Sequence, residues 1–176
     1  MKYYIVALFN KESYEVLTPL QKKFTKKFRA NRNCPTPHIA LDILETTNIE
    51  KITPVIEKVL KPYKKFKIEY SDNNISINDS LKTLTLKVEN RGYIKKIYRS
   101  LTDNFELNGI NVKFSPKEEL GLSIATINHI NKDRKNEIDS TNKENINTLK
   151  IDRLEIWRLS SNKREVCLKS FPLKNF

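Results

Sequence analysis

Cysteine, histidine and long hydrophobic runs are all scarce in this sequence, and each scarcity narrows what the chain can be. The two cysteines, Cys34 and Cys167, are too few for a disulfide framework and lack the spacing of metal ligands. No apolar run approaches the roughly 20 residues that a membrane-spanning helix needs, and the N-terminus enters a strand-like run directly. The sequence therefore predicts a cytoplasmic protein that has no membrane span.

Charge of one sign is present in excess. Lys and Arg number 33 against 21 Asp and Glu, which gives a net charge of +12. Such a charge favours a polyanionic partner such as nucleic acid. However, only 8 of the basic residues are arginine, and lysines also coat solvated helix faces. The charge permits RNA or a nucleotide as a partner without requiring it.

Hydrophobic residues make up 38% of the chain and recur in periodic runs, which is typical of a globular fold. The first runs predict a strand over 3–9, a helix behind a Thr18-Pro19 cap with Phe24 and Phe28 on its apolar stripe, and a strand over 38–44. A second helix is expected from about Thr53-Pro54. Beyond it, the patterns predict strands over 66–77, 84–88 and 122–127, a helix over 94–105, and strands over 153–159 and 166–171.

This order of elements predicts an α+β fold in a single domain over residues 1–176. The first half is partly echoed in the second half, so we expect two β-sheet lobes with helices packed outside and a central cleft. Residues 131–148 contain only Ile138 and Ile146 as apolar residues, and they are expected to form a mobile polar loop.

His38 begins the predicted strand that follows Cys34-Pro35-Thr36-Pro37. The chain has two histidines, and histidine is the side chain whose ordinary pKa lets it exchange protons near neutral pH. His38 is therefore a candidate for half of an acid–base pair. The alternative is a histidine at a strand end that makes a structural hydrogen bond.

The strand Pro37-His38-Ile39-Ala40-Leu41, in this order of elements, resembles the 2H phosphoesterase superfamily, which includes 2'-5' RNA ligase-like proteins and cyclic phosphodiesterases. The resemblance covers nearly the whole chain and rests on the order of elements. It implies that each lobe supplies a His-x-Thr/Ser motif on a strand. One imidazole removes a proton, the other protonates the leaving oxygen, and the hydroxyls bind the phosphate, with no metal or other cofactor.

Both motifs are degenerate here. The first reads His38-Ile39-Ala40, which keeps the histidine but lacks the hydroxyl. The second is best aligned on Ser123-Ile124-Ala125, where serine replaces histidine and alanine replaces the hydroxyl residue. Loss of a general acid or base costs about 10²–10⁴ in rate, and loss of a phosphate-binding donor roughly 10²–10³. We therefore expect the two-histidine reaction to be badly impaired.

Two residues are candidates to repair the second motif. His129 lies six residues after Ser123, so on a continuous strand it would point to the same face. Six residues of strand would, however, place it about 20 Å away. It replaces Ser123 only in a shifted register, and otherwise it is an exposed histidine at a strand end. Thr126 offers a phosphate-binding hydroxyl, but on a regular strand it would point to the face opposite Ser123, so this role requires a bulge between the two residues.

Tyr4 and Arg158 lie on predicted strands and join Ser123 and Thr126 as candidates for binding substrate. The alternative for Tyr4 and for Arg158 is that the side chain points outward from the outer face of a sheet.

Three functions remain open. One is binding of RNA ends or nucleotide phosphates with hydrolysis lost or weak. Another is a metal-independent 2',3'-cyclic or 2'-5' phosphodiesterase that uses His38 with a non-standard partner. The third is a protein–protein interaction module with a vestigial cleft.

Overall fold

The computed structural model describes residues 1–46, 48–78, 81–89, 92–114, 120–127, 146–160 and 164–175. The elements are β1 (Lys2–Phe9), α1 (Lys11–Lys27), β2 (His38–Glu45), a 3-10 turn (Ile49–Lys51), α2 (Ile52–Leu60), β3 (Phe66–Asn78), β4 (Thr83–Val88), α3 (Tyr93–Leu107), β5 (Asn111–Phe114), β6 (Gly121–Thr126), β7 (Ile146–Leu159) and β8 (Glu165–Pro172). None of the helices in the described part of the chain is both long and apolar enough to cross a membrane.

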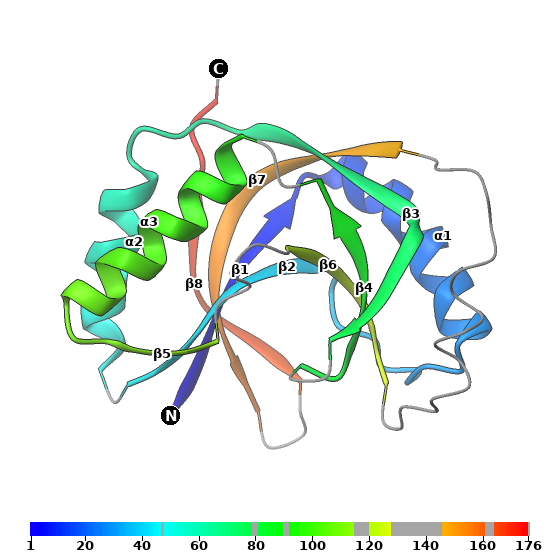
Figure 1. Ribbon diagram of the computed structural model, residues 1–176, viewed down its shortest axis with the longest axis horizontal. Coiled ribbons are helices and arrows are strands. Elements are labelled where there is room, and N and C mark those ends of the chain that lie inside the picture. The colour runs from blue at the N-terminus through cyan, green and yellow to red at the C-terminus, as the bar shows by residue number, and fades with distance from the viewer. Residues whose placement is uncertain are drawn as a thin grey trace.

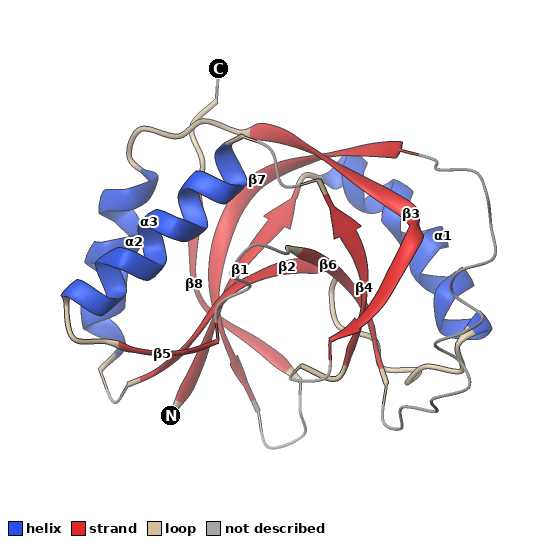
Figure 2. Ribbon diagram, in the orientation of Figure 1, coloured by secondary structure: helices blue, strands red, loops and turns tan. Residues whose placement is uncertain are grey.

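The strands form one antiparallel sheet in the order β1-β2-β6-β4-β3-β7-β8, with β5 paired to β2 and β1 also paired to β7 (Figure 1). Helices α2 and α3 pack together at the left of the view in Figure 2, and α1 lies at the right. The predicted α+β class is confirmed. Strand β2 pairs directly with β6, so the two motif strands are neighbours although they are far apart in sequence.

The helices and one face of the sheet share the main hydrophobic core. Leu17 of α1, Ile56 of α2 and Leu101 of α3 are fully buried there, together with Ile39 of β2 and Leu122 of β6. Successive residues of a strand point to opposite faces, so the neighbours of these strand residues lie on the other face.

That second face carries its own small cluster of Val6, Leu8 and Trp157. His38 contacts the Trp157 ring, so we call this surface the His38 face.

Helix α1 begins well before the predicted Thr18-Pro19 cap, and that prediction was wrong. Asn10 is the actual cap, because its side chain accepts a hydrogen bond from Ser13 N at 3.0 Å. Pro19 lies inside the helix, where its missing N–H has a cost. Tertiary packing offsets that cost, since Leu17 is fully buried and the Ser13 hydroxyl accepts a hydrogen bond from Lys150 N.

The C-terminal boundary of the polar loop predicted over 131–148 was wrong. Residues 146–148 belong to β7 and pair with residues 69–71 of β3, a register that no local pattern reveals. Residues 131–145 lie outside the described residues. The short strand β5 was not predicted, because four residues are too few for a periodic signal and its pairing with β2 creates it.

Candidate functional site

His38 is the first residue of β2, and its ring is held on two sides. Its Nδ1 lies 2.7 Å from the carbonyl oxygen of Thr36, and its ring centroid lies 4.7 Å from that of Trp157 in an edge-to-face arrangement. A carbonyl oxygen only accepts hydrogen bonds, so Nδ1 carries the proton of the neutral ring and Nε2 holds the lone pair. The lone pair at Nε2 can accept a proton from a substrate hydroxyl or water.

Burial keeps the His38 imidazole neutral at physiological pH. The residue is 9% exposed, and this burial lowers its pKa below the usual value. The hydrogen bond to Thr36 and the charge of Glu165 oppose that decrease. The geometry therefore fits a proton acceptor.

Ser123 of β6 stands directly opposite His38 in the antiparallel register. Opposed residues of such a pair project to the same face, with Cβ atoms about 4.5–5.5 Å apart. Ser123 is 1% exposed, and its Oγ has no hydrogen-bond partner among the described residues. The two positions that the resemblance assigns to histidines thus face each other as one histidine and one serine.

Strand β6 contains a bulge at Ile124. Leu84 pairs with Ala125, whereas Thr85, the next residue of β4, pairs with Ser123. One residue of β6 is therefore extra, and both Ile124 and Ala125 point into the main core. Ala125, the expected second-motif position, lies away from the His38 face.

The bulge brings Thr126 to the His38 face. Thr126 pairs with Thr83, and Thr83 lies two residues before Thr85, so these two residues of β4 share a face. Because Thr85 pairs with Ser123, Thr126 and Ser123 also share that face. The bulge that a phosphate-binding role of Thr126 requires is therefore present.

Strand β2 contains a comparable bulge at Leu41. Val6 pairs with Ala40, whereas Ile5 pairs with Asp42. Ala40 therefore stays on the His38 face beside Val6 and supplies no hydroxyl. Asp42 points the other way, and its carboxylate accepts a hydrogen bond from the Thr102 hydroxyl of α3 at 3.0 Å.

Hydroxyl groups line the part of the face next to Ser123. Thr83 Oγ1 is buried and, like Ser123 Oγ, has no partner among the described residues. Leaving such a group unpaired costs about 1–3 kcal/mol. Thr85, between them, donates to or accepts from Ser76 Oγ at 2.8 Å. Ser123 and Thr83 therefore each carry a buried hydroxyl that the described residues leave unpaired. Thr83 was not among the sequence candidates, because its place on this face depends on strand pairing.

Residues of β7 and β8 support the Trp157 ring that packs on His38 and the connector that precedes His38. Trp157 Nε1 donates to Glu155 Oε2 at 2.6 Å, and Glu155 Oε1 accepts from Arg153 Nε at 2.9 Å. Glu165 of β8 accepts from Thr36 N at 3.1 Å. The sequence did not single out Glu155 or Glu165, because only the fold brings β7 and β8 beside the start of β2.

Tyr4 and Arg158 line one pocket of about 550 Å³ together with Met1, Lys2, Leu159 and Ser160. Tyr4 is the register partner of Trp157, so this pocket adjoins the residue that packs on His38. Burial raises the pKa of the Tyr4 hydroxyl, which keeps it a hydrogen-bond donor at neutral pH. His38 itself does not line the pocket.

His129 lies outside the described residues, so its predicted alternatives are untested. The described residues contain no cluster of three or more His, Cys, Asp or Glu side chains able to hold a metal ion. Cys34 is half-buried, and its Sγ contacts Thr25 Oγ1 at 3.1 Å, whereas Cys167 is exposed.

No protein-family model matches the sequence, and the comparison with curated proteins finds no match. Solved structures do match over the full length. TT0787 of Thermus thermophilus gives a TM-score of 0.64 at 13% identity, covering 99% of both chains. E. coli LigT complexed with NADP+ gives 0.62 at 10% identity, covering 99% of this chain and 98% of LigT. A protein described as a phosphoesterase gives 0.60 at 9% identity, with the same coverage of each chain.

At such identities the likeness concerns the fold. The chain has the α+β fold of the LigT-like 2H phosphoesterases over its whole length, as the order of its elements predicts.

Proposed function

We propose that this chain binds the phosphate of nucleotides or RNA ends on the His38 face, and that its hydrolytic activity is lost or weak. The observation that carries the proposal is the register pair of His38 and Ser123, which puts a serine where the two-histidine reaction needs a second imidazole. Serine at its ordinary pKa neither gives nor takes a proton at neutral pH without a helper. Loss of one general acid or base costs about 10²–10⁴ in rate.

Phosphate binding is supported by the hydroxyls around that pair. Ser123 and Thr83 present buried, unpartnered hydroxyls among the described residues, and the bulge at Ile124 adds Thr126 to the same face. Such groups can donate to phosphate oxygens. Structures of E. coli LigT, which has the same fold, have been solved with ATP, 3'-AMP and phosphate.

The pocket formed by Tyr4 and Arg158 supports a nucleotide in preference to phosphate alone. It adjoins Trp157, and it carries the cationic side chains of Lys2 and Arg158. We assign it the remainder of the nucleotide, with the phosphate toward His38.

Calorimetric titration with 3'-AMP tests the binding. We expect wild-type protein to bind, His38→Ala and Ser123→Ala to weaken binding at least tenfold, and His129→Ala, the matched control at the second histidine, to bind as wild type. The proposal fails if wild-type protein does not bind 3'-AMP at low salt, which would leave the protein–protein interaction module.

Phosphorus NMR with 2',3'-cyclic nucleotides and a 2'-5' dinucleotide tests the chemistry. We expect little or no product. Rapid turnover that His38→Ala abolishes would instead establish the metal-independent phosphodiesterase, and loss of that turnover in His129→Ala would identify its non-standard partner.

A further inference from the structure

Gln21 is a polar residue on the buried stripe of α1. Leu17 and Phe24, four residues before it and three after it, are buried in the main core, and Gln21 itself is half-buried. Its Nε2 donates to the carbonyl oxygen of Pro35 at 2.7 Å and to that of Ile124 at 2.9 Å. A primary amide has two N–H groups, so both of them are bound to backbone carbonyls.

The first of these carbonyls lies in the short segment before His38. Pro35 and Pro37 have no N–H, so the three carbonyls of Pro35-Thr36-Pro37 and the N–H of Thr36 are the groups that need partners. The Thr36 carbonyl accepts from His38 Nδ1, and the Pro35 carbonyl accepts from Gln21. The other two groups bind a carboxylate of β8 and a tyrosine hydroxyl of α1. Because the Thr36 carbonyl orients the imidazole, the contacts that hold this segment also orient His38.

The second carbonyl belongs to the bulge of β6. Ile124 is the extra residue of that bulge, which leaves it outside the ladder with β4. Strand β2 begins opposite Ser123, so the residues of β6 that follow Ser123 extend beyond the start of β2. Gln21 binds the Ile124 carbonyl in this stretch. The bulge that turns Thr126 to the His38 face is therefore held from α1.

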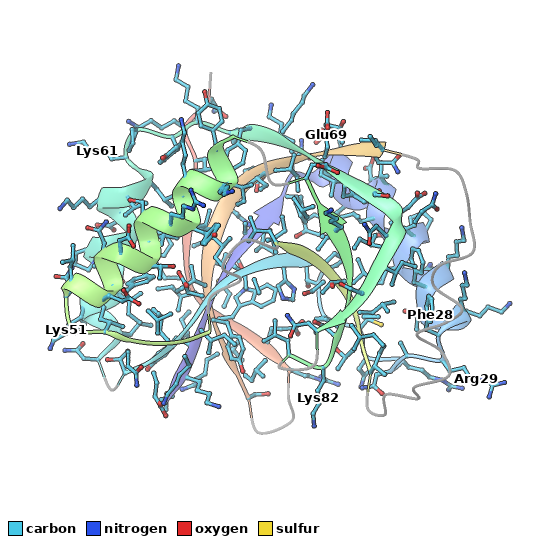
Figure 3. All side chains as sticks on the ribbon, viewed as in Figure 1. Phe28, Arg29, Lys51, Lys61, Glu69 and Lys82 are labelled. Atoms are coloured by element: carbon cyan, nitrogen blue, oxygen red, sulfur yellow. The ribbon has the colours of Figure 1, made fainter. Side chains whose placement is uncertain are left out.

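The connector between α1 and β2 passes the same end of β6. It turns at Phe28 and Arg29, at the right of the view in Figure 3, where Arg29 has a φ of 49°. Asn31 N then donates to the carbonyl oxygen of Thr126 at 3.0 Å. The connector thus contacts the end of β6 before it reaches His38.

From these contacts we infer that Gln21 is a positioning residue of the phosphate site, whose single amide holds both the segment that orients His38 and the bulge that presents Thr126. The inference rests on the proposed function and identifies what keeps the two halves of the site at a fixed spacing. Binding depends on this spacing, because groups displaced by about 1 Å no longer fit the ligand. Both N–H groups of Gln21 are used by the backbone, so it acts through His38 and Thr126.

Two substitutions of Gln21 test the inference. Gln21→Met keeps the length of the side chain and removes both donors. Gln21→Asn keeps the amide on a stem that is one methylene shorter, and it decides the question if Gln21→Met does not fold. Thr18→Ala is the matched control on the same helix, because the exposed Thr18 hydroxyl donates within the helix, to the Tyr14 carbonyl at 2.8 Å.

Calorimetric titration with 3'-AMP measures the effect on binding. Loss of a residue that orients a metal-binding histidine weakens binding about 10–100-fold, and we expect the lower end of this range, about tenfold, for Gln21→Met. Thr18→Ala should bind 3'-AMP as wild-type protein does.

Proton NMR of the ligand-free proteins measures the effect on His38. We expect the His38 Nδ1 proton to shift and to exchange faster with water in Gln21→Met, and to be unchanged in Thr18→Ala. A purely structural glutamine would lower the Tm and leave both this signal and the affinity for 3'-AMP unchanged. If wild-type protein binds 3'-AMP, the absence of either effect in Gln21→Met overturns the inference.

Failure of the proposed function is recognised separately, because wild-type protein itself would then not bind 3'-AMP. In that case the Nδ1 proton of the ligand-free protein decides alone whether Gln21 positions His38. A changed signal in Gln21→Met supports this positioning, and an unchanged signal overturns it.

Discussion

The imidazole of His38 is packed between the Thr36 carbonyl and the Trp157 ring, so its protonation is linked to folding. Burial lowers its pKa in the folded chain, whereas the unfolded chain keeps a value near 6.5. Below about pH 6.5 the unfolded state therefore binds the proton first, and stability that is present above this pH is lost as the pH falls.

We predict that His38→Gln flattens this acid-side dependence. Urea unfolding at about pH 7.5 and pH 5 should show a smaller loss of unfolding free energy for the variant than for wild type. Identical losses in the two proteins would show that His38 is not the group that titrates.

Glu165 reaches His38 through the backbone of Thr36. Its carboxylate accepts from Thr36 N at 3.1 Å, and its negative charge raises the pKa of His38. Glu165→Gln should therefore lower the pKa of His38 further, as measured by NMR titration of the imidazole. The exposed Glu57, which pairs with Lys169, provides the control Glu57→Gln. An unchanged His38 pKa in Glu165→Gln would contradict this role.

At the scale of elements, the approach of β4 to β6 depends on Gly121. A Cβ at this position would lie 2.9 Å from Thr85 Cβ, closer than real Cβ atoms come. Because Thr85 is the register partner of Ser123, the strands that carry the site must separate to admit even a methyl group.

Gly121→Ala should therefore destabilise the fold by about 1–3 kcal/mol, the usual cost of overpacking. Urea unfolding measures this, with Leu107→Ala as the control, since Leu107 is 83% exposed and its loss should change stability by less than about 0.5 kcal/mol. A Gly121→Ala variant as stable as wild type would mean that β4 and β6 are not packed as closely as the structure shows.

Sequence periodicity predicted long elements well and special positions poorly. Helix α3 was predicted because its apolar stripe is regular, whereas the order of the strands in the sheet was not predicted. The start of α1 was missed because Pro19 resembles a first-turn proline, whereas Asn10 caps the helix and the packing of Leu17 allows Pro19 to lie inside it. The bulge at Ile124 was left open because a bulge is a property of two paired strands, and it decides which face Thr126 occupies.

At the scale of the whole molecule, the site exists only when distant segments meet. His38 comes from β2, Ser123 from β6, and Trp157, which packs on His38, from β7. Sequence reasoning could align His38 with Ser123 through the resemblance. It could not find Thr83 or Glu165, since Thr126 and Thr36, which they contact, lie far away in the chain.

A ligand at such a site should stabilise the entire fold. Binding to the native state alone adds about 2.7 kcal/mol when the ligand is at 100 times its Kd. We therefore predict that 3'-AMP raises the Tm of wild-type protein clearly more than that of His38→Ala, as measured by calorimetry. An equal rise in both proteins would place the ligand away from His38.

The central claim, that His38 and Ser123 hold a phosphate between them, is tested most directly by NMR of the His38 imidazole. With only two histidines, the ring signals can be assigned by comparison with His129→Gln. We predict that 3'-AMP shifts the His38 Nε2 resonance to a saturating value in wild-type protein, and that Ser123→Ala weakens this response. If 3'-AMP binds and the His38 resonances do not move, the claim is contradicted.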